Sequence, residues 1–266
     1  MLCRPRRALN ENVEALPRIT LLHGFAQNRR CMGPIALDLE RDHQVELLDL
    51  PGHGQRAEAP STLDVAAETI AQAIGPEPTL LFGYSLGARA ALHVALHAPA
   101  RVRGLILLGG TPGLRTDAER VARRFDDERW ARLLELRGLT AFLEAWTAQA
   151  IFADIPPSLK NPEARRDNRA EGLAAMLRLA GTGAQRSRWE DLSRLEMPVL
   201  LLSGERDAKF SAIAAQMLPA IGSRAVHQLI PRAGHAAHLV APEATSALIR
   251  SFSARLAPPG SGPPAP

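Results

Sequence analysis

The sequence predicts an α/β fold with a mostly parallel, doubly wound sheet, and three observations support this class. Short runs rich in Leu, Ile and Val are each bounded by Gly or Pro, which is typical of strands buried on both faces. Helical stretches alternate with these runs, as they do where right-handed crossovers join parallel strands. One long helical segment interrupts the alternation, so we expect an insertion after the end of a strand.

The expected strands and core helices follow one another along the chain. The apolar runs that we assign to strands are Ile19 to Leu22, Val45 to Leu50, Thr79 to Phe82, Leu105 to Leu108, Val199 to Leu202 and Ala225 to Ile230. The stretches that we assign to helices are Leu63 to Ile74, Leu86 to Leu96, Ile213 to Leu218 and Pro242 to Leu256. Each helix falls between two strands or after the last one, so the helices can cover both faces of one sheet.

The interruption runs from Gly113 to Trp189 and contains no credible strand. It holds arginine-rich amphipathic stretches instead, including Glu119 to Leu136 and Ala164 to Leu179. Helices inserted after a strand end form a lid or a substrate subdomain. We therefore expect an α/β core at 1–112 and 190–257, a helical lid at 113–189, and a tail at 258–266 whose Pro and Gly content predicts disorder.

Composition excludes several classes of protein. The 266 residues, 46% apolar and 23% charged, fit one globular domain with an insertion. The net charge is +4, but the basic residues, 30 of 32 of them arginine, are scattered among 28 acids, so we expect no nucleic-acid partner. No apolar stretch reaches the roughly 18 residues of a membrane helix and we find no secretory signal, so we expect a cytoplasmic protein without membrane insertion. Cys3 and Cys31 form neither a disulfide framework nor a zinc pair, and we expect reduced thiols.

The strongest motif is Gly83 to Gly87, with the sequence G-Y-S-L-G. It follows an apolar strand and opens a helix rich in Ala and Leu, which is the context of a nucleophile elbow. Glycines on either side permit a strained turn that lifts the Ser85 hydroxyl off the sheet above a helix N-terminus. The alternative is an ordinary strand-to-helix turn with an incidental serine.

A serine needs a base and an acid, because its hydroxyl is inert until an imidazole takes the proton and a carboxylate holds that imidazole. Asp207 stands just past one later strand, and His235 stands past the next. Their order after Ser85 is the one that this type of elbow requires. Glu205 and His238 are neighbouring alternatives for the acid and the base.

Other motifs concern the same end of the sheet. Phe25 follows a His-Gly pair after the first strand, and we expect the backbone N–H groups of Phe25 and Leu86 to be oxyanion donors. We interpret the loop from Asp49 to Gly54, with its His53, as structural. His93 and His97 lie four apart on a helix but lack a third ligand, so we expect no metal site.

These motifs resemble the α/β-hydrolase fold, and more closely one family within it: the synthases of 2-succinyl-6-hydroxy-2,4-cyclohexadiene-1-carboxylate in menaquinone biosynthesis. The resemblance rests on the elbow G-Y-S-L-G-A-R, the acid loop G-E-R-D-x-K-F and the lid, and runs from about Leu21 to Phe252. The similar lid stretches are Glu119-Arg120-x-x-Arg123-Arg124-x-x-Asp127, Gly138-Leu139-x-x-Phe142-Leu143-x-x-Trp146-x-x-Gln149-x-x-Phe152 and Gly172-Leu173-Ala174-x-Met176-Leu177.

The resemblance implies a lyase that eliminates pyruvate without a metal or another cofactor. Ser85, activated by His235 and Asp207, would act as a base on the carbon next to the succinyl ketone. The alternative on the same triad is a hydrolase of an ester or a C–C bond in a small anionic substrate. A third possibility is a ligand-binding member of the fold without catalytic activity.

The resemblance also implies which residues bind the substrate, a small polycarboxylate. Its carboxylate-binding arginines fall on Arg89, Arg123 and Arg165, and its aromatic pocket residues fall on Tyr84, Trp146 and Phe152. The helical period independently favours Arg89, because a residue four positions after Ser85 lies one turn away on the same side. The lid holds 13 arginines from Arg115 to Arg188, so Arg124 and Arg166 remain adjacent alternatives.

Overall fold

A parallel sheet of six strands forms the centre of the computed structural model, which describes residues 16–160 and 162–256. The strands are β1 (Arg18–Leu22), β2 (Gln44–Leu48), β3 (Thr79–Tyr84), β4 (Val102–Leu108), β5 (Val199–Gly204) and β6 (Ala225–Ile230). Their order in the sheet is β2-β1-β3-β4-β5-β6. The order reverses direction between β1 and β3, and the crevice beyond the carboxyl ends of such neighbouring strands is the usual ligand site of an open α/β sheet.

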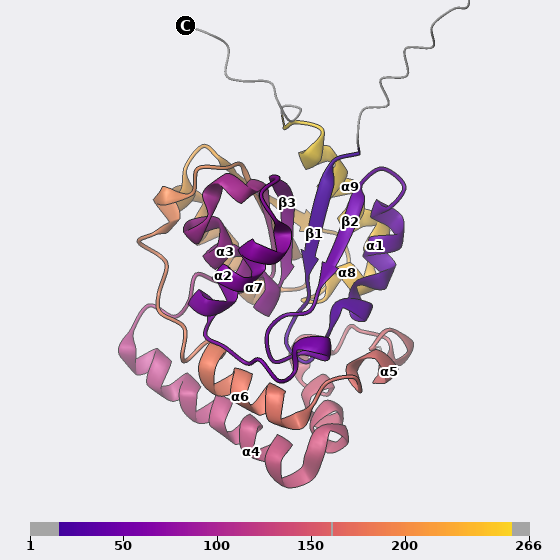
Figure 1. Cartoon of the computed structure of the whole chain (residues 1–266), viewed down its shortest axis with the longest axis vertical. Helices are drawn as coiled ribbons and strands as arrows, with labels where there is room; N and C mark the ends of the chain where they lie inside the picture. The colour runs from indigo at the N-terminus through magenta and orange to yellow at the C-terminus, as the bar shows by residue number, and fades with distance from the viewer. Residues whose placement is uncertain (1–15, 161, 257–266) are drawn as a thin grey trace, which may run out of the picture.

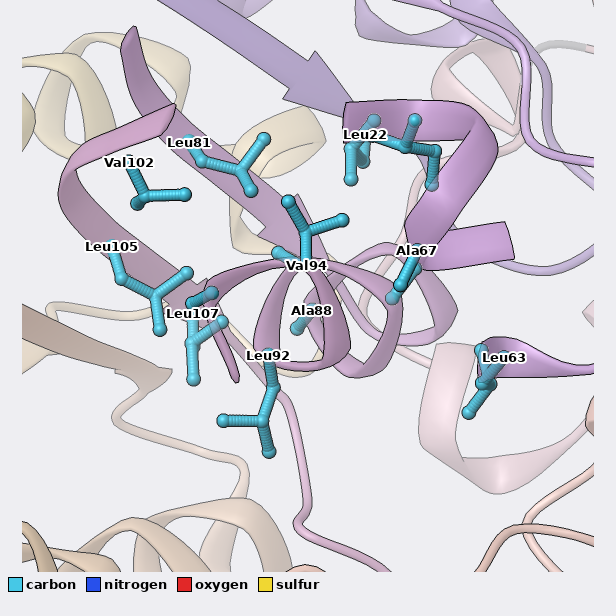
Figure 2. Packing of buried hydrophobic residues seen from close by; sticks show 14 of the residues in the cluster. Leu22, Leu63, Ala67, Leu81, Ala88, Leu92, Val94, Val102, Leu105 and Leu107 are labelled. Carbon is cyan, nitrogen blue, oxygen red and sulfur yellow. The ribbon is translucent and has the colours of Figure 1, made fainter. Parts of the chain in front are cut away.

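Helices cover both faces of the sheet (Figure 1). One face carries α2 (Leu63–Ile74), α3 (Leu86–His97) and α7 (Ala208–Ile221), and the other carries α1 (Gly33–Leu39), α8 (Ala237–Val240) and α9 (Pro242–Ser253). Successive strand residues point to opposite faces, so each face has its own apolar core. Figure 2 shows side chains of α3, including Val94, among side chains of β3 and β4 such as Leu81 and Leu105.

The predicted fold class and the alternation of strands and helices are confirmed, with two differences. The outermost strands β2 and β6 are only partly buried, and Val226 and Leu229 of β6 are 40% and 49% exposed. The prediction that every strand is buried on both faces was wrong here, because a run of apolar residues does not reveal which strand lies at an edge. Sequence reasoning also missed α1 and α8, which are too short for a clear helical period.

The segment between β4 and β5 is helical and lies across the carboxyl ends of the strands (Figure 1). It contains α4 (Asp117–Thr147), α5 (Pro162–Arg165) and α6 (Ala170–Ala180), with short 3-10 turns at 150–152 and 157–159. A Thr116 capping box with Glu119 begins α4, and Gly138 kinks it at φ 74°. The single helix expected at Ala164 to Leu179 was wrong, because a turn separates α5 from α6.

An aromatic cluster attaches this helical segment to the sheet. The ring of Phe25, just after β1, lies 5.0 Å from the ring of Trp146 and 6.2 Å from that of Phe142. Arg178 of α6 also pairs with Glu128 and Glu135 of α4. The loop after β1 is therefore packed directly against the lid.

Some expectations have a limited structural counterpart. The predicted tail at 258–266 and Cys3 lie outside the described residues. None of the helices within the described ranges has the length and apolarity of a membrane span.

Candidate active site

The serine elbow joins β3 to α3 in a strained conformation. Ser85 has a φ of 53° and a ψ of −105°, which a residue with a side chain adopts only when its surroundings enforce it. A Cβ atom on Gly83 would lie 2.2 Å from the Gly87 carbonyl oxygen, and one on Gly87 would lie 2.2 Å from the Leu22 carbonyl oxygen. The two glycines thus allow the helix to approach the sheet closely enough to hold the elbow.

Ser85, His235 and Asp207 form a continuous chain of hydrogen bonds. The Ser85 Oγ atom lies 3.1 Å from His235 Nε2, and His235 Nδ1 lies 2.7 Å from Asp207 Oδ2. The other carboxylate oxygen of Asp207 accepts the Phe210 N–H at the start of α7, which fixes the carboxylate. Because the carboxylate accepts the proton on Nδ1, the Nε2 lone pair faces the serine and can take its proton.

The alternative acid and base occupy other places. Glu205 is exposed and accepts the Arg232 N–H, so it stabilises the loop after β6. His238 is fully buried beside Tyr84, with ring centroids 4.1 Å apart, and has no hydrogen-bond partner among the described residues. Burial lowers the pKa of His238 to about 3, so the ring is neutral.

The two residues expected to supply oxyanion donors line the same cavity as the serine. Phe25 and Leu86 both line the cavity above Ser85, and neither backbone N–H has an acceptor within the described part of the chain. The loop after β1 is held by two histidines, because His23 accepts the Leu50 N–H and His53 accepts the Ala26 N–H.

Both of these histidines are neutral. Each donates its Nδ1 proton to a backbone carbonyl, that of Gly24 for His23 and that of Pro51 for His53. Burial lowers their pKa values to about 4 and about 3 respectively. This geometry agrees with the structural interpretation of the loop that carries His53.

A cavity of about 580 Å³ separates the elbow from the lid. Its charged lining comprises the cations Arg89, Arg123, Arg206 and Lys209, the carboxylates Asp127 and Asp207, and His235. Asp207 is bound to His235, and Asp127 is bound to Arg123 at 2.8 Å. The cavity therefore carries an excess of positive charge and suits an anionic ligand.

Arg89 and Arg123 both line the cavity. Arg89 is 8% exposed and donates to the Ala180 carbonyl and to Gln185. Burial is the main reason that its pKa is lowered to about 10, and nearby Arg123 lowers it further. Trp146 and Phe152 also line the cavity, together with Phe25.

Tyr84 and Arg165 do not line the cavity, which differs from the expectation. Tyr84 is buried behind the elbow, between the rings of His235 and His238. Arg165 is also buried, and its guanidinium donates to the carbonyls of Lys160 and Ala26. α5 ends at Arg165, so the side chain turns toward the loop after β1 and stabilises the segment that presents Phe25.

The adjacent alternatives Arg124 and Arg166 do not line it either. Arg124 donates to the Gly183 carbonyl, and Arg166 pairs with Glu163. Both guanidinium groups are thus used within the lid.

Sequence reasoning missed several residues of the site. Arg206, Lys209 and Phe210 line the cavity, and the Phe210 ring lies 4.4 Å from that of His235. All three flank Asp207 in the acid-loop motif, which was the available signal. Asp154 of the lid accepts the Gly234 N–H at 2.5 Å, and no local pattern marks that contact.

No metal site accompanies this arrangement in the described ranges. No group of three or more His, Cys, Asp or Glu side chains is placed to hold a metal ion there. His93 binds Asp64 through Nδ1, and His97 is exposed. Cys31 is a buried free thiol, and burial raises its pKa.

Comparison with known proteins agrees with the fold. The pattern of the Alpha/beta hydrolase family matches residues 21–248. The chain is similar to two proteins named 2-succinyl-6-hydroxy-2,4-cyclohexadiene-1-carboxylate synthase. That of Yersinia pseudotuberculosis is 36% identical over 89% of this chain and 87% of that protein, and that of Serratia proteamaculans is 32% identical over 92% and 96%.

Solved structures agree as well. The structure of MenH from S. aureus matches with a TM-score of 0.84 at 28% identity, over 91% of this chain and 94% of that one. A thermophilic esterase from Thermogutta terrifontis shares the fold, with a TM-score of 0.74 at 23% identity over 91% of each chain. The chain therefore belongs to the alpha/beta hydrolase family and, within it, to the 2-succinyl-6-hydroxy-2,4-cyclohexadiene-1-carboxylate synthases.

Proposed function

We propose that this protein is a cytoplasmic lyase of menaquinone biosynthesis. It eliminates pyruvate from 2-succinyl-5-enolpyruvyl-6-hydroxy-3-cyclohexene-1-carboxylate and forms 2-succinyl-6-hydroxy-2,4-cyclohexadiene-1-carboxylate. The observation that carries the proposal is the hydrogen-bonded chain of Ser85, His235 and Asp207 on the floor of a cavity with excess positive charge. A serine base and a site for several carboxylates are what this elimination requires.

In the first step Ser85 acts as a base. His235 takes the proton from the serine hydroxyl, and the Ser85 oxygen removes the proton from the ring carbon that bears the succinyl group. That C–H bond is acidic because the adjacent ketone accepts the electron pair as an enolate. We expect the N–H groups of Phe25 and Leu86, two residues that line the cavity, to donate to the enolate oxygen and so to lower the barrier.

In the second step the electrons move through the ring. The enolate collapses to a new double bond at ring positions 2 and 3, the existing double bond shifts to positions 4 and 5, and the C–O bond to the enolpyruvyl group breaks. The leaving enolpyruvate gains the proton that His235 and Ser85 hold and becomes pyruvate. Atoms and charge balance without water and without a redox partner.

The competing function is hydrolysis, because the same triad and oxyanion donors suit attack of Ser85 on an ester carbonyl. The two functions differ in their products. The purified protein should release pyruvate from the cyclohexene substrate, measured by coupling to lactate dehydrogenase, and should turn over a nitrophenyl ester negligibly. Rapid ester hydrolysis without pyruvate release would replace the lyase by a hydrolase. Product binding without turnover of either compound would indicate a ligand-binding protein.

Substitution of the serine tests the mechanism. Ser85→Ala should lower kcat for pyruvate release by several orders of magnitude and leave the fold intact. Ser251→Ala, at an exposed position on α9, is the matched control and should behave as the unsubstituted protein. If Ser85→Ala retained its activity, the assignment of Ser85 as the base would be wrong.

A further inference from the structure

One wall of the cavity is a turn that Arg89 holds from the core side and the Asp127 carboxylate of α4 holds from the lid side. The turn follows the end of α6 at Ala180 and contains Gly181, Thr182 and Gly183. On the core side, Arg89 Nη1 donates to the Ala180 carbonyl at 2.7 Å and to Gln185 Oε1 at 3.1 Å. The turn is thus bonded at both of its ends to the helix that begins at the elbow.

On the lid side, α4 holds the middle of the turn. Asp127 Oδ2 accepts the Gly183 N–H at 3.3 Å, while Asp127 Oδ1 accepts Arg123 Nε at 2.8 Å. A Cβ atom on Gly181 would lie 2.4 Å from Asp127 Oδ2, so the glycine permits this close approach. Thr182 therefore lies in a segment that Arg89 anchors from the core and that Asp127, itself paired with Arg123, anchors from the lid.

Thr182 is the only residue of Gly181 to Gly183 with a side chain, and it lines the cavity. Within the described part of the chain, neither its Oγ1 nor its backbone N–H has a hydrogen-bond partner. The nearby Asp127 carboxylate is already occupied by Arg123 and Gly183. Thr182 thus brings to the cavity wall a hydroxyl and an N–H without a partner in the described residues, and Arg89 and Arg123 line the same cavity.

These groups together favour a carboxylate ligand. Arg89 is buried without a carboxylate of its own in the described ranges, and Arg123 is near enough to lower its pKa. An anion between the two would offset their repulsion. A hydroxyl and an N–H add directional donors, and hydrogen bonds to charged groups are stronger than those between neutral groups.

We propose that Thr182 is a specificity-determining residue that donates hydrogen bonds to one substrate carboxylate bound between Arg89 and Arg123. The assignment rests on the proposed function, because it takes its ligand from the polycarboxylate substrate. It adds to the arginines a neutral donor that distinguishes a carboxylate at this position from a less polar group.

The test removes the hydroxyl and keeps the shape. Thr182→Val should raise KM for pyruvate release about tenfold with kcat largely retained, and should weaken product binding in calorimetry by a similar factor. Thr182→Ser keeps the hydroxyl and should restore both values. Thr140→Val, at an exposed position on α4 that does not line this cavity, is the matched control and should change neither. Thr182→Ala gives the same readout if the valine impairs folding.

The possible failures are distinguishable. If the unsubstituted protein releases pyruvate but Thr182→Val and Thr182→Ala keep its KM and product affinity, the role of Thr182 is refuted and the lyase stands. An equal loss in Thr182→Ser also refutes it, because the effect would then come from packing. If the unsubstituted protein releases no pyruvate, the proposed function fails and the carboxylate assignment fails with it.

Discussion

Replacing Arg89 by methionine should weaken substrate binding more than the same replacement of Arg123. Arg89 is 8% exposed, so an ion pair with a substrate carboxylate would form away from water. A desolvated, hydrogen-bonded pair of this kind contributes on the order of 2 kcal/mol, which corresponds to a rise in KM of roughly 30-fold. Methionine fills much of the space and removes the charge.

The expected effect at Arg123 is smaller. Its side chain is 36% exposed and already pairs with Asp127, so solvent and the neighbouring carboxylate weaken its attraction for the substrate. We expect Arg123→Met to weaken the free energy of substrate binding by about 1 kcal/mol or less, which corresponds to a rise in KM of about fivefold at most. The order of the two effects follows from the deeper burial of Arg89 and from the Asp127 ion pair of Arg123.

The assay measures initial rates of pyruvate release, with thermal unfolding followed by circular dichroism. Arg89→Met leaves the Ala180 carbonyl and the Gln185 side chain without their donor, which costs about 1–3 kcal/mol of stability for each buried group. Rates must therefore be compared well below the unfolding temperature. Arg89→Lys keeps the charge and should give an intermediate KM. A larger effect at Arg123, or no effect at either position in folded protein, would refute the argument.

Three further predictions follow from other contacts. Burial lowers the pKa of His53 to about 3, so between about pH 6.5 and 3 the ring takes up a proton on unfolding and the free energy of unfolding should fall as the pH drops. Because His23 and His238 contribute in the same direction, His53→Gln should reduce this pH dependence in urea unfolding without abolishing it, and His97→Gln should leave it unchanged. Asp154→Ala removes the acceptor of the Gly234 N–H, which precedes His235, so the catalytic ring should be positioned less well. We expect kcat to fall about tenfold with KM unchanged, and a change in KM alone would contradict this positioning role. Gly87→Ala places a Cβ atom 2.2 Å from a backbone oxygen and should lower the unfolding temperature markedly; an unchanged temperature would contradict the close packing of the elbow.

The elbow could be predicted from the sequence because its causes are local. The run before Ser85 is a buried strand, the run after it is a helix, and the glycines at 83 and 87 are those that close packing requires. Arg89 could be predicted for the same reason, since a helical period fixes its side relative to Ser85. Asp207 and His235 follow strands whose carboxyl ends must meet at one edge of a parallel sheet.

The lid side of the site could not be predicted in this way. Arg165 turns away from the cavity because α5 ends there and the Ala26 carbonyl, far away in sequence, accepts its guanidinium. Thr182 reaches the cavity because Gly181 and Gly183 let the chain pass close to α4. Both placements depend on contacts between distant segments, and helical periodicity carries no information about those contacts.

The distribution of charge around Ser85 gives a reason for elimination over ester hydrolysis. Arg89 lies on the helix that Ser85 begins, beside the lid, whereas Arg206 and Lys209 flank Asp207 at the start of α7. A ligand with separated carboxylates can engage both groups at once, and this double attachment fixes the carbon between them over the serine. A simple ester offers only one point of attachment or none, so its carbonyl is not held against Ser85 and the oxyanion donors. We therefore propose that these two groups of cations select the substrate, and that the acidic C–H bond of the substrate then lets Ser85 act as a base.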